Sequence, residues 1–262
     1  MSTQSKPTKR ELREQRRAER LESERAEAAA AARKRRGLTL LGALGVAAVA
    51  VVIAIAVSSS GGKSDAPASA ASTNQAAGLF AGIPERDGVL GKKSAPLTLT
   101  EFVDLQCPIC AETSKTTLPT LIQDYVRTGK VKLDARTLHF IGPDSSTAAL
   151  MAAGAQQQGK LWPFLEAFYA MQGEENSGYV TDDFLRQVAQ AAGVDADKAL
   201  AYAKTAAAQD RLNQANRDAE TLGVNATPTF AVARGDGQAK VIAGGNHDIG
   251  SLSAALDAEA KQ

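Results

Sequence analysis

The sequence predicts an α/β domain that carries a helical insertion and follows a single N-terminal transmembrane helix. Three observations support this. An uncharged apolar run occupies residues 38–57, strand, helix and strand patterns follow one another between residues 95 and 140, and a mainly helical stretch (about 143–222) precedes two short strands. The strand, helix, strand order favours a parallel βαβ unit.

Residues 37–57 are predicted to form the membrane anchor. The stretch "LTLLGALGVAAVAVVIAIAV" contains no charge and no proline, and a helix of this length rises about 30 Å, enough to cross a bilayer. Residues 1–36 hold twelve Lys/Arg and six Glu and end in "RKRR", a basic flank that stays cytoplasmic. The charged tail is therefore expected in the cytoplasm and the remaining chain outside the cell membrane. A cleaved signal peptide is the alternative, since "AIA" (54–56) has the small-x-small pattern, although a signal's apolar region is shorter.

Residues 58–78 are rich in Ser, Gly and Ala and predict a flexible tether. The folded domain is expected to span residues 79–262. Its predicted elements, in order, are a strand at 95–104, a helix starting around Cys110, a strand at 130–140, helices beginning after Thr181 and after Asp195 with the latter running to about Leu222, strands at 228–233 and 239–244, and a helix from about Asp248.

Both cysteines lie in "DLQCPIC" (104–110), at the predicted junction between strand and helix. A zinc site would need further ligands, and the two histidines, His139 and His247, are far apart in sequence. A purely structural disulfide would close too small a loop to restrict the unfolded chain much. A redox pair fits the position best, because a helix N-terminus stabilises a thiolate.

In that redox interpretation Cys107, at the exposed end of the helix, is the nucleophile. Cys110, one turn later and more buried, resolves the mixed disulfide. Pro108 and Ile109 shape the active-site turn between them.

Two separated motifs carry a resemblance to a known family. The strand-Cys-Pro-x-Cys-helix arrangement and the later "GVNATPTF" (223–230) resemble the thioredoxin superfamily. The separation of 118 positions from Cys110 to Pro228 is similar to that in the DsbA-like branch, whose thioredoxin-like fold is interrupted by a helical domain. Over about residues 80–262 the chain resembles bacterial membrane-anchored oxidoreductases of this branch.

The resemblance implies roles for three further residues. Pro228 would be a cis-proline beside the redox pair, and Thr227 and Pro228 would dock a peptide substrate. Glu101, six residues before Cys107, would be a partly buried acid that accepts the proton of Cys110. An exposed strand residue is the alternative for Glu101, and Asp104 is a rival acid. The sequence contains no phosphate-binding Gly-rich loop of recognised form and too few close ligands for zinc, so neither a dissociable cofactor nor a metal is expected.

Three functions remain open at this point. An oxidase would donate the Cys107–Cys110 disulfide to exported proteins and be reoxidised by a membrane redox partner. A reductase or isomerase would work in the other direction, and Ile109, where strongly oxidising DsbA-type sites usually have histidine, leaves this open. A tethered adaptor would bind peptides without turnover. The basic residues cluster beside the membrane span, so a nucleic-acid partner finds no support.

Overall fold

The computed structural model describes residues 78–244 and 249–261. The predicted cytoplasmic tail (1–36), the transmembrane helix (37–57) and the tether up to residue 77 lie outside the described residues. Within the part that is described, no helix is both long and apolar enough to cross a membrane.

A six-stranded mixed sheet forms the centre of the domain, in the order β1-β2-β4-β3-β5-β6. β3 and β4 run parallel, and the other neighbours pair antiparallel. The strands are β1 (Glu85–Arg86), β2 (Val89–Leu90), β3 (Leu97–Asp104), β4 (Val131–Leu138), β5 (Thr229–Arg234) and β6 (Lys240–Gly244). The predicted parallel strand pair is confirmed, since β3 and β4 are aligned from Leu97 opposite Val131 to Asp104 opposite Leu138.

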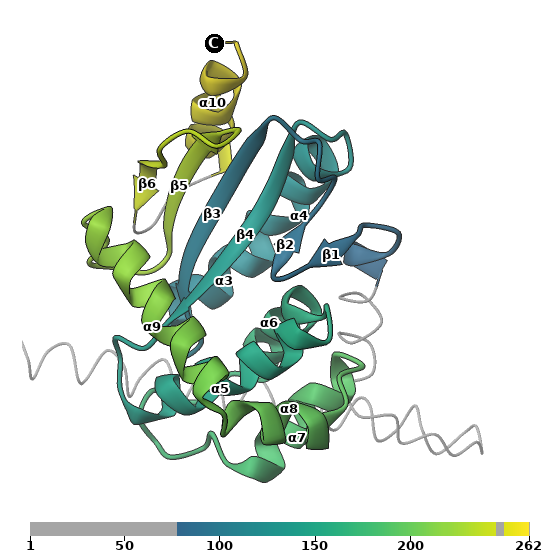
Figure 1. Ribbon diagram of the computed structural model, residues 1–262, viewed down its shortest axis with the longest axis vertical. Coiled ribbons are helices and arrows are strands. Elements are labelled where there is room, and N and C mark those ends of the chain that lie inside the picture. Colours follow the sequence, from purple (N-terminus) through teal and green to yellow (C-terminus); the bar gives the residue numbers. More distant parts are fainter. Residues whose placement is uncertain (1–77, 245–248, 262) are drawn as a thin grey trace, which may run out of the picture. The chain divides into compact units, whose positions relative to one another are not determined.

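Helices cover both faces of the sheet and its lower end (Figure 1). They are α3 (Pro108–Thr116), α4 (Leu118–Leu121), a π-helical turn (Ile122–Val126), α5 (Pro143–Gln157), α6 (Leu161–Ala170), α7 (Asp182–Ala191), α8 (Ala196–Ala203), α9 (Ala206–Thr221) and α10 (Ile249–Ala260). In Figure 1, α5 to α8 gather at the end of the sheet where β3 and β4 finish. The insertion therefore lies beside the segment that carries the cysteines.

The residues of β3 alternate between two cores, because successive side chains of a strand point to opposite faces. Leu99 and Val103 pack in the core formed with α3, α4, α6 and α10. Phe102 packs on the other face with Ala215 and Ala219 of α9. Glu101 shares the parity of Leu99 and Val103 and so points toward α3.

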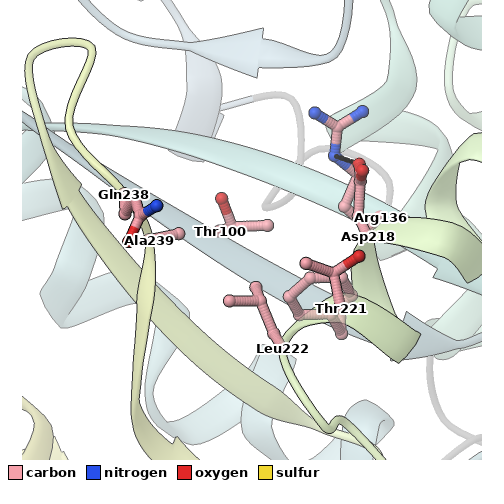
Figure 2. Close-up of a pocket in the computed structure, with 8 residues that line it drawn as sticks. Thr100, Arg136, Asp218, Thr221, Leu222, Gln238 and Ala239 are labelled. Atoms are coloured by element: carbon pink, nitrogen blue, oxygen red, sulfur yellow. Dashed lines mark ion pairs between the residues drawn. The ribbon is translucent and has the colours of Figure 1, made fainter.

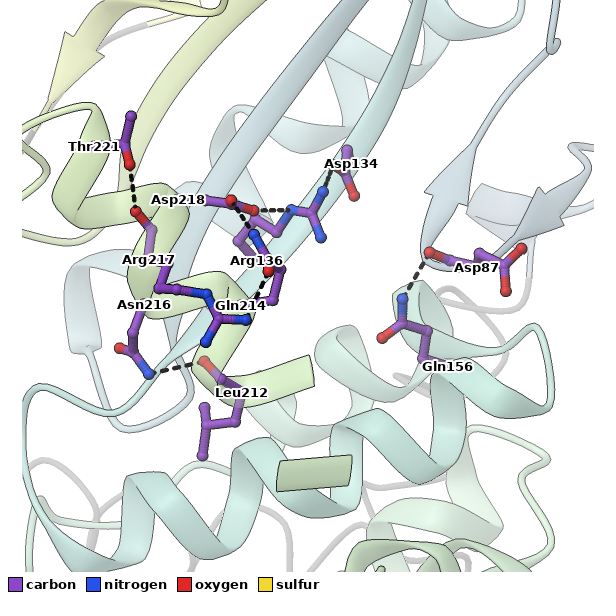
Figure 3. Close-up of polar contacts among 10 residues, drawn as sticks. All are labelled: Asp87, Asp134, Arg136, Gln156, Leu212, Gln214, Asn216, Arg217, Asp218 and Thr221. Atoms are coloured by element: carbon purple, nitrogen blue, oxygen red, sulfur yellow. Dashed lines mark hydrogen bonds and ion pairs between the residues drawn. The ribbon is translucent and has the colours of Figure 1, made fainter. Parts of the chain in front are cut away.

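Polar contacts at two places fasten outlying elements to the fold (Figure 3). Arg136 on β4 pairs with Asp134 at 2.9 Å and with Asp218 on α9 at 3.6 Å, which ties α9 to the sheet. Gln156 on α5 donates a hydrogen bond of 2.6 Å to the carbonyl oxygen of Asp87 in the turn between β1 and β2.

Three local features differ from the sequence-based expectations. The helix expected from Asp195 to about Leu222 is two helices, because Thr205 caps a new one by accepting a hydrogen bond from the Ala208 N–H. The helix that starts near Cys110 is interrupted before Pro119, which cannot donate an intrahelical hydrogen bond. The β1–β2 hairpin was not predicted, although Asp87 and Gly88 both adopt positive φ (53° and 84°), as a two-residue hairpin turn requires.

Candidate active site

Helix α3 begins at the first cysteine. Cys107 is the N-cap residue, and its sulfur accepts a hydrogen bond from the backbone N–H of Cys110 at 3.4 Å. Pro108 occupies the first turn, where no backbone donor is needed. Both cysteines are free thiols in this structure. The sulfur of Cys107 thus takes the place of the capping oxygen at the positive end of the helix dipole.

The two cysteines differ in burial in the expected order, but both are more enclosed than the sequence suggested. Cys107 is 6% exposed and Cys110 is 1% exposed. The expectation of an exposed Cys107 is therefore wrong, because the loop before β5 lies against its sulfur and Thr227 accepts a hydrogen bond from the thiol at 3.3 Å. The exposed residues of the turn are Pro108 and Ile109, the latter at 42%.

The second motif reaches the cysteines through the sheet. β5 pairs antiparallel with β3, with Thr229 opposite Phe102, so the residues just before β5 lie beside the loop that follows β3. The Thr227–Pro228 peptide bond is cis, as the resemblance predicted. The structure thus brings Thr227 and Cys107 into contact across 120 residues of sequence.

The thiol of Cys107 is acidified by its neighbours. A hydrogen bond from the Cys110 side chain lowers the pKa of Cys107 most, and burial opposes this. Further lowering comes from the side chain of Thr227, as distinct from its carbonyl, and from the backbone N–H groups of Cys110 and Ile109. The resulting pKa of Cys107 is about 6. For Cys110, burial raises the pKa well above its ordinary value. At neutral pH Cys107 is the thiolate and Cys110 holds its proton.

We expect the thiolate absorbance of the reduced chain near 240 nm to titrate with a midpoint of about 6. In Cys110→Ala the midpoint should rise, because the largest acidifying hydrogen bond is lost. An ultraviolet pH titration of both chains, with Cys107→Ser as the blank, measures this. An unchanged midpoint in Cys110→Ala would contradict the assignment of that bond.

Glu101 lies under the helix that bears the cysteines. It is 7% exposed, so the alternative of an exposed strand residue is wrong. Burial, and then the charge of Glu166, raise the pKa of Glu101 to about 8. The charge of Glu101 in turn contributes to the raised pKa of Cys110. A carboxyl that titrates near neutral pH beside a buried thiol is suited to exchange protons with it.

The rival acid, Asp104, has a different environment. Its side chain is fully buried and accepts three hydrogen bonds, from the N–H of Gln106 at 2.9 Å, the N–H of Ile141 at 3.1 Å and the hydroxyl of Ser145 at 2.7 Å. These bonds connect the end of β3 to the start of the insertion. They occupy the carboxylate, which makes Asp104 an anchor for the loop that leads to Cys107.

Two residues of the insertion that the sequence did not single out hold the cysteine loop. Gln172, after α6, donates from Nε2 to the carbonyl oxygen of Leu105 at 2.7 Å and to that of Cys107 at 3.2 Å. Asn176 donates its backbone N–H to the side chain of Gln106 at 2.7 Å. Neither residue belongs to a recognisable sequence motif. Their contacts form only when the insertion folds back over the cysteine loop, so no local sequence signal indicates them.

A cavity of about 470 Å³ lies on the other face of the sheet (Figure 2). It is lined by Thr100, Phe102, Arg136, Asp218, Thr221, Leu222, Gln238 and Ala239. Thr100 and Phe102 have the opposite parity to Glu101 on β3, so the sheet separates this cavity from the cysteines. It contains no cysteine and is not where thiol chemistry takes place.

Among residues 78–244 and 249–261, no group of three or more His, Cys, Asp or Glu side chains is placed to hold a metal ion. His139 is exposed at the end of β4, and His247 lies outside the described residues.

Comparison with known proteins agrees with this geometry. A family model described as Thioredoxin matches residues 85–258. A "Probable disulfide bond formation protein D" of Bacillus cereus is 28% identical over 177 residues, which cover 66% of this chain and 78% of that protein. The crystal structure of oxidised BdbD from Bacillus subtilis is similar with a TM-score of 0.60 and 25% identity, over 69% of this chain and 97% of that one. A thioredoxin-like oxidoreductase from Silicibacter pomeroyi is similar with a TM-score of 0.56 and 26% identity, over 71% and 98%.

Proposed function

The chain belongs to the thioredoxin family and is a DsbA-like thiol-disulfide oxidoreductase, and from this premise we propose that it is a membrane-tethered oxidase of exported proteins. The apolar run at 37–57 is the anchor in this proposal, with the catalytic domain outside the cytoplasm. Disulfides persist in that compartment. Relatives named for disulfide bond formation support the same direction.

Cys107 and Cys110 carry the exchange in two steps. A substrate thiolate attacks the sulfur of Cys107 in the oxidised pair, the Cys107–Cys110 bond breaks, and Cys110 leaves as a thiolate that takes a proton from Glu101. A second substrate thiolate then attacks the substrate sulfur of the mixed disulfide, and Cys107 leaves as a thiolate. The substrate loses two electrons and gains a disulfide, and the pair becomes a dithiol. A membrane redox partner restores the disulfide.

The observation that carries the oxidase direction is the position of Cys107 as an N-cap thiolate that receives several hydrogen bonds. These bonds hold its pKa at about 6, so the reduced form of the pair is stabilised at neutral pH. Stabilising the reduced form makes the disulfide a stronger oxidant. Ile109 in place of histidine does not prevent this, because the acidifying groups are the backbone, Cys110 and Thr227.

Substrate docking is assigned to the turn and the loop that flank the sulfur of Cys107. Thr227 and Pro228 precede β5 and lie beside that sulfur, where an extended peptide can align with their backbone. Pro108 and Ile109 are exposed at the start of α3, and the Ile109 side chain offers an apolar contact. Recognition through backbone and one apolar contact suits many different exported sequences.

The test is the reduction potential of the pair. The full chain is equilibrated with mixtures of reduced and oxidised glutathione, and free thiols are trapped and counted by mass. We expect a value above the roughly −180 to −210 mV of an oxidising secretory compartment. A value near the roughly −270 mV of thioredoxin would overturn the oxidase direction in favour of a reductase or isomerase. The Cys110→Ser variant cannot form the Cys107–Cys110 disulfide, so it gives the background of mixed disulfide between Cys107 and glutathione.

A further inference from the structure

The inserted helices bring a second acid to the cysteine pair. Glu166 lies on α6, and the hydroxyl of Ser114 on α3 donates a hydrogen bond to its Oε1. Ser114 follows Cys110 by four residues, so the two side chains lie one turn apart on the same face of α3. Both are buried, at 4% and 1% exposed. The bond from Ser114 therefore fixes the Glu166 carboxyl next to the helix face that presents Cys110.

Glu101 approaches the same face from the sheet. It lies on β3, which packs beneath α3, and no described residue donates a hydrogen bond to its carboxyl group. Glu101 thus faces α3 from the sheet, and Glu166 reaches the same helix through Ser114. The charge of Glu166 also raises the pKa of Glu101. Glu101 is deeply buried, whereas Glu166 is partly exposed. The two carboxyl groups therefore both adjoin the helix that bears Cys110, with Glu101 in the deeper position and Glu166 at a position that reaches solvent.

We infer that Glu166 carries protons between Glu101 and solvent whenever Cys110 gains or loses its proton. This inference rests on the proposed function and adds a residue that the cysteine motif does not contain. Glu166 does not touch the reacting sulfurs, so it is a positioning residue that acts through Glu101.

The proton balance closes at each step. When the pair is reoxidised, Cys107 first forms a mixed disulfide with the redox partner. Cys110 then transfers its proton to the Glu101 carboxylate, and the Cys110 thiolate attacks the sulfur of Cys107. The disulfide between Cys107 and the partner breaks, and the partner's sulfur leaves as a thiolate. Glu101 then passes the proton to the Glu166 carboxylate, which releases it to water. When the pair oxidises a substrate, the same path supplies the proton that Cys110 takes up on leaving.

Burial is the largest influence on the pKa of Glu166 and raises it to about 7, while the hydrogen bond from Ser114 and the charge of Lys115 lower it. A group that titrates near neutral pH at a partly exposed position can both accept and release a proton there. The titratable groups around this site are Glu101 and Asp104 from the end of β3, Cys107, Cys110 and Lys115 from the segment around α3, and Tyr169 from α6.

The experiment follows the resolving step by itself. The reduced full chain is mixed with oxidised glutathione and quenched in acid at intervals, and the Cys107 mixed disulfide and the closed pair are separated by mass between pH 5 and 9. In Glu166→Gln the rate of closure should fall about tenfold, within the range of general acid and base catalysis. Its midpoint should also move to lower pH, because Glu101 ionises more readily without a neighbouring negative charge.

The amide of Glu166→Gln can still accept the hydrogen bond from Ser114, so a purely structural role predicts no change in rate or midpoint, and that result would overturn the inference. Glu112→Gln, which removes an exposed carboxyl from the same helix α3, is the matched control and should behave as wild type.

A second measurement tests the inference even if the Glu166→Gln chain does not fold. Carbon-13 NMR of the glutamate carboxyls in the wild type should show Glu101 titrating in two steps that follow Glu166, as coupled groups do. In Ser114→Ala the Glu166 step should move to higher pH, since the lost hydrogen bond lowers its pKa. If Glu101 titrated in a single step that did not depend on the ionisation of Glu166, proton transfer between the two carboxyl groups would be excluded. If wild type itself never closes the pair with glutathione, the proposed function fails, whereas the carboxyl titration still decides the role of Glu166.

Discussion

Replacing Cys107 with serine should abolish disulfide exchange, lowering turnover by more than about 1,000-fold, because a thiolate and not a hydroxyl is the nucleophile in this chemistry. The environment that holds the pKa of Cys107 at about 6 cannot ionise a serine hydroxyl at the same pH. The measurement is the oxidation of a reduced peptide that contains two cysteines. The peptide is mixed with the wild-type chain, whose pair has first been oxidised, or with the variant, and its disulfide is detected by mass spectrometry.

Serine is a good N-cap residue, so Cys107→Ser should keep the start of α3 and fold as wild type. Cys110→Ser is the informative partner, since its remaining thiolate can still attack but nothing resolves the product. We expect it to accumulate a mixed disulfide between Cys107 and the peptide or glutathione. If the Cys107→Ser, Cys110→Ser double variant retained full function, the adaptor alternative would replace the oxidase.

The core of the candidate site could be predicted from the sequence because its chemistry lies in two short motifs. The spacing of Cys107 and Cys110 places both at the first turn of one helix, and the turn before β5 contains the proline whose peptide bond is cis. Both motifs depend on local backbone geometry, which a few residues determine. Whether these residues perform the proposed catalytic steps stays a prediction for the variants above.

The contacts from the insertion could not be predicted in the same way. Gln172 and Glu166 reach the cysteine segment only after α6 packs against α3, more than 50 residues later in sequence. Glutamine after a helix and glutamate on a helix are ordinary surface patterns, so neither position carries a local signal. The burial of Glu101 was predictable only through the resemblance, because the alternating pattern of the strand is equally consistent with an exposed acid at this position.

The strands β3 and β4 and the Thr181 cap of α7 followed from periodicity and capping. The break between α8 and α9 did not, because "AYAKTAAAQ" is composed mostly of good helix formers. The cap formed by Thr205 outweighs that propensity once α8 packs on α5 and α9 turns toward the sheet. Tertiary packing decided the boundary.

Replacing Glu101 with glutamine should make the stability of the domain less sensitive to a rise in pH between about 4.5 and about 8. The carboxyl titrates near 4.5 in the unfolded chain and near 8 when folded, so the folded state binds a proton that the unfolded state has already lost between these values. Stability is therefore lost as pH rises from about 4.5 to about 8. A shift of this size corresponds to a loss on the order of 4 kcal/mol across the window, which Glu101→Gln should largely remove.

Denaturant unfolding of the reduced chain at a series of pH values between 4 and 9 measures this difference. The other shifted groups are the same in both chains and cancel in the comparison, and Glu112→Gln, an exposed carboxyl on α3, should leave the wild-type slope unchanged. Parallel curves for wild type and Glu101→Gln would mean that Glu101 ionises freely in the fold and cannot hold a proton for Cys110. The expected divergence would instead show that the domain gives up stability between about pH 4.5 and 8 to keep a protonated acid under its buried thiol. The same variant should then be slower in every step where Cys110 changes its protonation.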